Sequence, residues 1–119
     1  MSQQRVLRIN ELIKEEMGKI LLRELDLEKG VLVTVTRVST SPNLYNANVF
    51  VSVYPQEHEK RVVQGLRGQI YELQQFLNKR LRMRPVPKIA FVEETLVREA
   101  GDVEKRLAEI NTAQGESEV

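Results

Sequence analysis

Hydrophobic positions follow two different periods along the chain, and each period predicts one type of element. In residues 4–25 apolar side chains recur every three or four positions, which is the spacing of one helix face. Residues 31–38 are rich in β-branched side chains. Residues 45–54 alternate between apolar positions and mostly polar ones, so both segments are predicted to be strands. A Ser-Pro-Asn turn separates them, and the simplest arrangement is an antiparallel hairpin.

The alternation in the second strand assigns its side chains to two faces. One face is predicted to meet the core and carries Tyr45, Ala47, Val49, Val51 and Val53. The other face carries Asn46, Asn48, Phe50, Ser52 and Tyr54. Its two aromatic residues, Phe50 and Tyr54, could stack on nucleic-acid bases. Alternatively, they cover a sheet edge or pack under the C-terminal tail.

A second helical period runs through residues 57–82. Its apolar stripe consists of Val62, Leu66, Ile70, Leu73, Leu77 and Leu81. Gly65 and Gly68 lie inside this run, and because each lowers helix propensity by roughly 1 kcal/mol relative to Ala, a bend or break is predicted near them. Prolines after Arg84 end the helix, and residues 89–92 predict a third strand.

The predicted elements make one α+β domain over residues 1–110, with a three-stranded sheet that carries helices on one face. Apolar residues near its end predict a short helix around residues 103–110. Residues 111–119 are polar and acidic and are expected to be a disordered tail.

Composition excludes several kinds of chemistry. The chain has no cysteine, and its single histidine, His58, lies in a polar stretch without a second ligand, so we expect neither a metal nor a thiol nucleophile. Neighbouring carboxylates such as Glu15 and Glu16 point apart, and no phosphate-binding loop is present. Charged residues interrupt the N-terminal segment, so we do not expect it to be a signal peptide, and no apolar run is long enough to span a membrane. These features predict a cytoplasmic protein without catalysis or cofactor.

The distribution of charge is more informative than the net charge of +1. Residues 1–60 contain equal numbers of basic and acidic residues. Residues 61–88 contain seven Lys or Arg and one acidic residue, whereas residues 89–119 contain three Lys or Arg and eight acidic residues. This segregation indicates a basic face that meets a polyanion, although a solvated helix face is the alternative.

Five cations crowd the end of the second helical run and the loop after it. They are Lys79, Arg80, Arg82, Arg84 and Lys88. The helix dipole favours cations at this end, but five exceed what capping needs, so phosphate contact is predicted. Since Arg80, Arg82 and Arg84 lie off the apolar stripe, the fold is not expected to need them.

A Gly-x-x-Gly motif at Gly65 and Gly68, with Arg61 and Arg67 beside it, is a second candidate. Between two helices such a motif can clamp a nucleic-acid backbone, because missing side chains let phosphates approach the amides. The alternative is a helix that tolerates two glycines.

Three segments carry a resemblance to a known family. They are Arg5-Val6-x-Arg8-Ile9 with the rest of its apolar stripe, Thr34 to Val38 followed by Ser41-Pro42-Asn43-Leu44, and Leu77-x-Lys79-Arg80-Leu81-x-Met83-Arg84-x-Val86-Pro87-x-Ile89-x-Phe91. In order and spacing, over about residues 5–110, they resemble the ribosome-binding factor A family.

The resemblance implies a KH-like (type II) fold of the order αββααβ. It also implies binding to the 30S ribosomal subunit, a role in late maturation of its 16S rRNA and a role in growth in the cold. From the single complete set of amphipathic elements we expect a monomer, with no membrane or small-molecule partner. Our RNA-contact candidates are Arg5, Arg8, Lys79, Arg80, Arg82, Arg84 and Lys88, and then Arg61, Gly65, Arg67 and Gly68. The alternatives are a protein-interaction adaptor that uses its first helix and acidic tail, and an RNA-binding protein not specific to the ribosome.

The sequence departs from the family pattern between its two central helices. Family members usually carry an Ala-x-Gly kink, where this chain has Gln69-Ile70-Tyr71, and Gln74 stands where an arginine is frequent. The kink is therefore expected either at the glycines Gly65 and Gly68 or near Gln69 to Tyr71, unless the helix is straighter. Glu94 corresponds to the usual Asp after the third strand.

Overall fold

The computed structural model describes residues 3–94, and its elements follow the expected αββααβ order. They are α1 (Gln3–Glu24), β1 (Leu32–Thr40), β2 (Asn46–Tyr54), the short 3-10 helix η1 (Gln56–His58), α2 (Glu59–Gly68), α3 (Ile70–Arg80) and β3 (Lys88–Glu93). The α+β class is thereby confirmed. The helix and tail that we expected after residue 102 lie outside the described residues.

The three strands form one sheet in the order β1-β2-β3. β1 and β2 are antiparallel, as a hairpin requires, whereas β2 and β3 are parallel. A parallel pair needs a long crossover connection, and α2 and α3 supply it. The pairing of β1 shifts between Val35 and Arg37, so that Thr36 forms a bulge.

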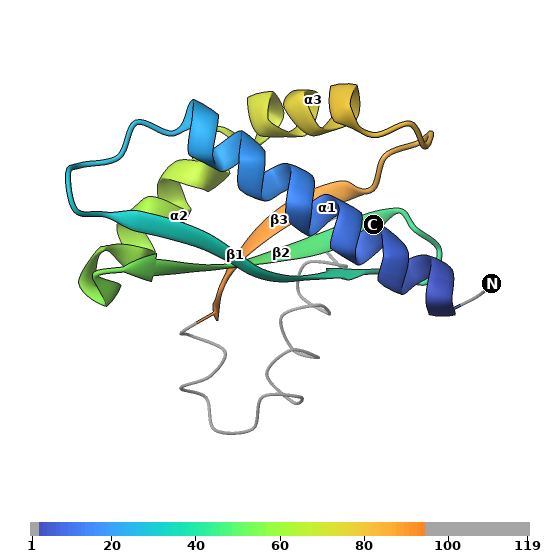
Figure 1. Ribbon diagram of the computed structural model, residues 1–119, viewed down its shortest axis with the longest axis horizontal. Coiled ribbons are helices and arrows are strands. Elements are labelled where there is room, and N and C mark those ends of the chain that lie inside the picture. Colours follow the sequence, from blue (N-terminus) through green and yellow to red (C-terminus); the bar gives the residue numbers. More distant parts are fainter. Residues whose placement is uncertain (1–2, 95–119) are drawn as a thin grey trace.

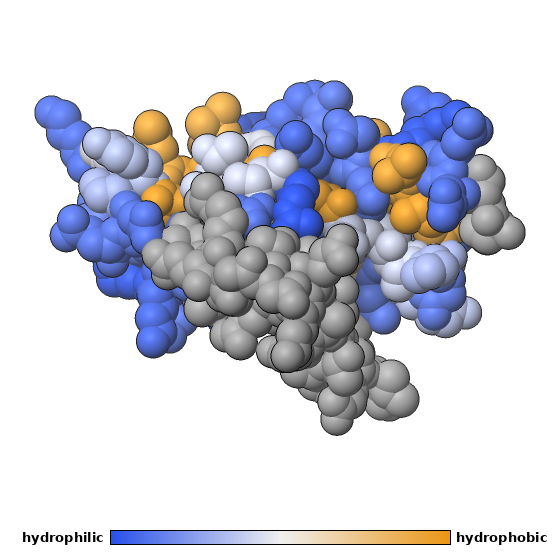
Figure 2. All heavy atoms as spheres, turned by 90° about the horizontal axis from the view of Figure 1, so that it is seen from below, coloured by the Kyte–Doolittle hydropathy of each residue, from blue (hydrophilic) through white to orange (hydrophobic). Residues whose placement is uncertain are grey.

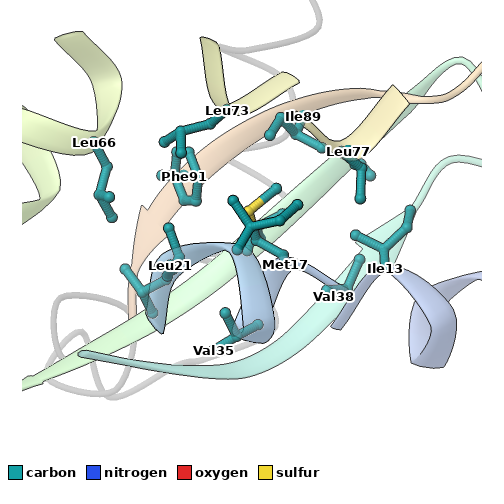
Figure 3. Packing of buried hydrophobic residues seen from close by; sticks show 14 of the residues in the cluster. Ile13, Met17, Leu21, Val35, Val38, Leu66, Leu73, Leu77, Ile89 and Phe91 are labelled. Carbon is teal, nitrogen blue, oxygen red and sulfur yellow. The ribbon is translucent and has the colours of Figure 1, made fainter. Parts of the chain in front are cut away.

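All three described α-helices cover the same face of the sheet, which agrees with the KH-like fold that the resemblance implies (Figure 1). Their apolar stripes meet the inward side chains of the strands in one core. Figure 3 shows Ile13 and Met17 of α1 near Leu77 of α3 and Phe91 of β3. Figure 2 shows hydrophilic side chains over most of the coloured surface, with separate hydrophobic patches between them.

One sequence-based assignment in the hairpin is wrong, and one alternative is excluded. Tyr45 is 64% exposed, because it lies in the turn before β2, and Leu44, with a φ of 65°, enters the core instead. Phe50 lies on the face opposite the helices, as expected, yet it is fully buried. The guanidinium of Arg37 lies over its ring, 3.8 Å from the centroid. Phe50 is therefore not available to stack on a base, whereas Tyr54 is 69% exposed.

The break between the two central helices falls at Gln69. This residue has a φ of −107° and a ψ of 16°, and its N–H still bonds back to the carbonyls of Gly65 and Leu66. Both glycines lie inside α2, so the break comes after them and not between them. The predicted break near the glycines is therefore confirmed, since it follows Gly68 directly and falls at Gln69 rather than between Gly65 and Gly68.

Candidate nucleic-acid interface

One end of the molecule collects most of the predicted cations. The start of α1, the turn between β1 and β2, and the loop of residues 81–87 all lie at this end (Figure 1). Two hydrogen bonds tie these segments together. The Thr40 N–H donates to the Asn10 side chain of α1 at 2.8 Å, and the Lys88 N–H donates to the Tyr45 carbonyl at 2.8 Å.

The loop of residues 81–87 is held by the side chain of Gln74 on α3. Its Nε2 donates to the Pro87 carbonyl at 3.0 Å, and its Oε1 accepts the Ile89 N–H at 2.9 Å. The same Nε2 donates to the Asn78 side-chain oxygen at 3.1 Å. One glutamine thus joins α3 to the exit of the loop and to the start of β3. We call this set of contacts the Gln74 brace.

Arg84 stabilises the other half of the loop. Its Nη1 donates to the carbonyls of Leu81 and Met83, each at 2.6 Å. Its Nε and Nη2 have no hydrogen-bond partner among residues 3–94. Arg84 is exposed, so these two nitrogens can still donate to an oxyanion while the third keeps the loop folded.

The cations around this loop differ in the ion pairs that they already form within the protein. Lys79, Arg82 and Lys88 are exposed, and their side chains have no ionic partner within the described chain. Arg80 instead donates to Glu16 of α1 through its Nη1 at 3.1 Å, and both side chains are partly buried. Arg80 therefore contributes to the packing of α3 on α1, contrary to the expectation that the fold does not need it.

The two predicted arginines of α1 lie at the same end of the molecule. Arg5 and Arg8 are both exposed, in the first turns of the helix. The structure thus brings the start of α1 and the 79–88 segment to one side, as phosphate contact by both would require.

The second set of candidates lies elsewhere, on α2. Arg61 donates to Glu28 at 2.8 Å and contacts the ring of His58. Arg67 donates twice to the Phe91 carbonyl, at 3.2 and 2.8 Å, and so covers part of the free edge of β3. Both guanidiniums are thus engaged within the protein, and neither adjoins the 79–88 segment.

Gly65 and Gly68 do not form the loop that a backbone clamp requires. Both are helical and exposed, and a Cβ added at either position would meet nothing within 4 Å. The interpretation of the motif as an inter-helix loop is therefore wrong, and whether the glycines touch RNA stays a prediction.

A shallow groove opens between α3 and the loop. Gln74, Asn78, Arg84, Pro85, Val86 and Lys88 line it. Gln74 and Asn78 were not among the predicted RNA-contact residues, because an uncharged amide in a helix forms no charge pattern or motif that would indicate a binding site. The only hint was the unusual glutamine at a position where the family often has an arginine.

Between residues 3 and 94, no three His, Asp or Glu side chains are placed to hold a metal ion. Nor does this part of the chain contain a helix long and apolar enough to cross a membrane.

Comparison with known proteins agrees with the resemblance. The family model described as ribosome-binding factor A matches residues 5–107. The ribosome-binding factor A of Thermosynechococcus vestitus is 33% identical over 99% of this chain and 96% of its own. That of Brevibacillus brevis is also 33% identical, over 99% of this chain and 98% of its own.

Solved structures share the fold. The crystal structure of ribosome-binding factor A from Thermus thermophilus superimposes with a TM-score of 0.66 at 22% identity, over 74% of this chain and 94% of the other. The solution structure of a Thermotoga maritima protein named as a ribosome-binding factor A gives 0.54 at 30% identity, over 70% and 84%. Because the family model spans nearly the whole chain and relatives agree over their full length, this chain belongs to the ribosome-binding factor A family.

Proposed function

We propose that this chain binds the 30S ribosomal subunit and assists late maturation of its 16S rRNA. Family membership supports this function, as does a model of the Thermus thermophilus factor fitted into a cryo-electron-microscopy map of its 30S complex. In this proposal the protein acts in the cytoplasm as a monomer, over a domain of about residues 1–110, without catalysis or cofactor.

The observation that carries the proposal is a set of exposed cations on a braced segment. Lys79, Arg82 and Lys88 lie at the end of α3 and on either side of the loop, and their side chains hold nothing else within the described chain. Because the Gln74 brace and two prolines fix the segment, little conformational entropy is lost when it meets a phosphate backbone. Arg84 extends the same surface with a guanidinium that can bind a phosphate bidentately, and Arg8 lies at the same end of the molecule, where it lines a separate hollow between α1 and β1. We call these five residues the loop-end cations.

Co-sedimentation with purified 30S subunits tests the proposal. We expect the variant with Lys79, Arg82 and Lys88 all replaced by Ala to remain folded and to bind more weakly. Each lost phosphate contact should reduce the slope of log affinity against log salt by about 0.7–0.9. The control removes the same charge elsewhere. Arg23, Lys29 and Lys60 are exposed, have no described partner and lie toward the opposite end of α1 and at the start of α2.

Equal weakening in both triple variants would mean that only net charge matters and that the loop end is not the interface. If the parent binds subunits with no dependence on salt, the adaptor alternative is favoured instead. Exposed leucines of α1, Leu7 and Leu22, would then be the first side chains to replace, because they are 62% and 86% exposed.

A further inference from the structure

We infer that the groove between α3 and the loop of residues 81–87 receives one unpaired nucleotide, with Asn78 contacting its base. This inference rests on the proposed function and adds to it a ligand: single-stranded rather than duplex RNA. It is carried by three features of the groove, namely an oriented amide, an apolar wall and cations at the rim.

The amide of Asn78 is oriented by the Gln74 brace. Its side-chain oxygen accepts from Gln74 Nε2 at 3.1 Å, which turns the opposite end, Nδ2, away from the brace. No other hydrogen bond engages the Asn78 side chain within residues 3–94. Asn78 is half-buried and lines the groove, and its Nδ2 carries two N–H donors that no described residue engages. Donors held in this way suit the ring nitrogens and carbonyl oxygens of a base.

The rest of the groove suits a flat ring attached to a phosphate. Pro85 and Val86 provide an apolar wall, against which a base can pack without losing hydrogen bonds. Arg84 and Lys88 line the same groove and carry the positive charge that phosphates flanking the base would need. Arg84 keeps Nε and Nη2 for this purpose, because only Nη1 is spent on the loop.

These features favour an unpaired nucleotide over a duplex. Side chains cannot read bases in the deep, narrow major groove of an RNA duplex, whereas unpaired bases expose their edges and faces. In a duplex the Watson–Crick edges are already paired, so the recessed Asn78 donors could not reach them. The exposed loop-end cations contact phosphates in either case. The groove should therefore distinguish single strands from duplexes, while the surrounding charge should not.

Fluorescence anisotropy with labelled RNA tests the inference. The probes are a ten-nucleotide oligouridine, a ten-nucleotide oligoadenosine and a ten-base-pair duplex. We expect Asn78→Ala to weaken binding of at least one single strand by about five- to tenfold, the effect of losing a hydrogen bond. Its affinity for the duplex and its salt slope should stay those of the parent. Gln75→Ala is the matched control, because Gln75 is an exposed amide on the same helix that does not line the groove.

A second variant guards against an indirect effect through the brace. Asn78→Asp keeps an oxygen for Gln74 Nε2 but has no donor, so it should lose single-strand affinity while its thermal unfolding stays near that of the parent. The inference is overturned if Asn78→Ala binds both single strands as the parent does, or loses affinity for single strands and duplex alike. Co-sedimentation with 30S subunits separates the two proposals, because parent protein that still sediments with subunits would leave the proposed function standing.

Discussion

The guanidinium of Arg80 lies 3.1 Å from a carboxylate oxygen of Glu16, and this contact joins the last turn of α3 to the middle of α1. The Arg80 side chain is 28% exposed and that of Glu16 15%, so neither is a freely solvated surface charge. Lys19 approaches the same carboxylate at 3.7 Å. The dense basic cluster seen in the sequence therefore contains two residues with structural contacts, Arg80 between the helices and Arg84 in the loop, beside Lys79, Arg82 and Lys88, whose side chains make no ion pair within residues 3–94.

Arg80→Ala is consequently expected to reduce stability as well as binding. It should lower the free energy of unfolding by about 1–2 kcal/mol, because Glu16 loses a charge-assisted hydrogen bond in a shielded position. Arg82→Ala, at an exposed neighbouring position, should change it by less than about 0.5 kcal/mol. Urea unfolding of both variants provides the comparison. Equal stability of the two variants would show that the ion pair contributes nothing.

Gln74→Leu should loosen the loop that presents the loop-end cations. The substitution removes two hydrogen bonds to backbone, at the Pro87 carbonyl and the Ile89 N–H, and should cost about 2 kcal/mol of stability. Hydrogen exchange of the Ile89 amide should become faster, whereas Gln75→Leu should leave it unchanged. An unchanged Ile89 amide in Gln74→Leu would mean that the brace does not hold the start of β3.

The elements of this fold were largely predictable, because periodicity reports burial and burial decides which elements form. The exceptions have physical causes. Tyr45 continues the alternation of β2 in sequence, but the chain reverses at Leu44, and the tyrosine leaves the sheet. The break at Gln69 is not such an exception, because it directly follows Gly68 and the low helix propensity of the two glycines had predicted a break near them.

The candidate site was predictable only in part. Clustering in sequence locates the cations between residues 79 and 88, but it cannot say which of them are already engaged. Arg67 and Arg80 look like their neighbours in the sequence, yet Arg67 covers part of the edge of β3 and Arg80 pairs with Glu16 of α1. Gln74 and Asn78 are recognisable only once α3 faces the loop. Contacts between residues far apart in sequence therefore decide these roles.

The resemblance-based assignment of Glu94 leads to a third prediction. Glu94 is 8% exposed and accepts hydrogen bonds from Thr36, in the bulge of β1, at 2.7 Å and from Arg37 at 3.0 Å. Removing a shielded carboxylate that two donors require should cost about 2–4 kcal/mol in Glu94→Ala. Glu94→Gln, which keeps an acceptor, should cost less. Thermal unfolding of both variants, with Glu93→Ala as the neighbouring control, measures the difference, and equal values for all three would contradict the prediction.

The glycines of α2 allow a backbone clamp to be separated from an ordinary helix. Gly65 lies within α2, and a Cβ there would meet nothing within 4 Å, so Gly65→Ala should raise stability by about 0.5–1 kcal/mol by restricting the unfolded chain. Gly30 is the matched control. Its φ is +88°, so Gly30→Ala should lower stability by about 1 kcal/mol or more, although space for the methyl group is equally open.

Because the N–H groups of α2 serve its own hydrogen bonds, Gly65→Ala should also bind 30S subunits as well as the parent does. Chemical denaturation of both glycine variants measures the stability changes, and co-sedimentation of Gly65→Ala beside the parent measures binding to 30S subunits. A Gly65→Ala protein that is more stable yet fails to bind would show that RNA approaches the α2 backbone closely after all, and the interface would then extend from the loop-end cations to α2.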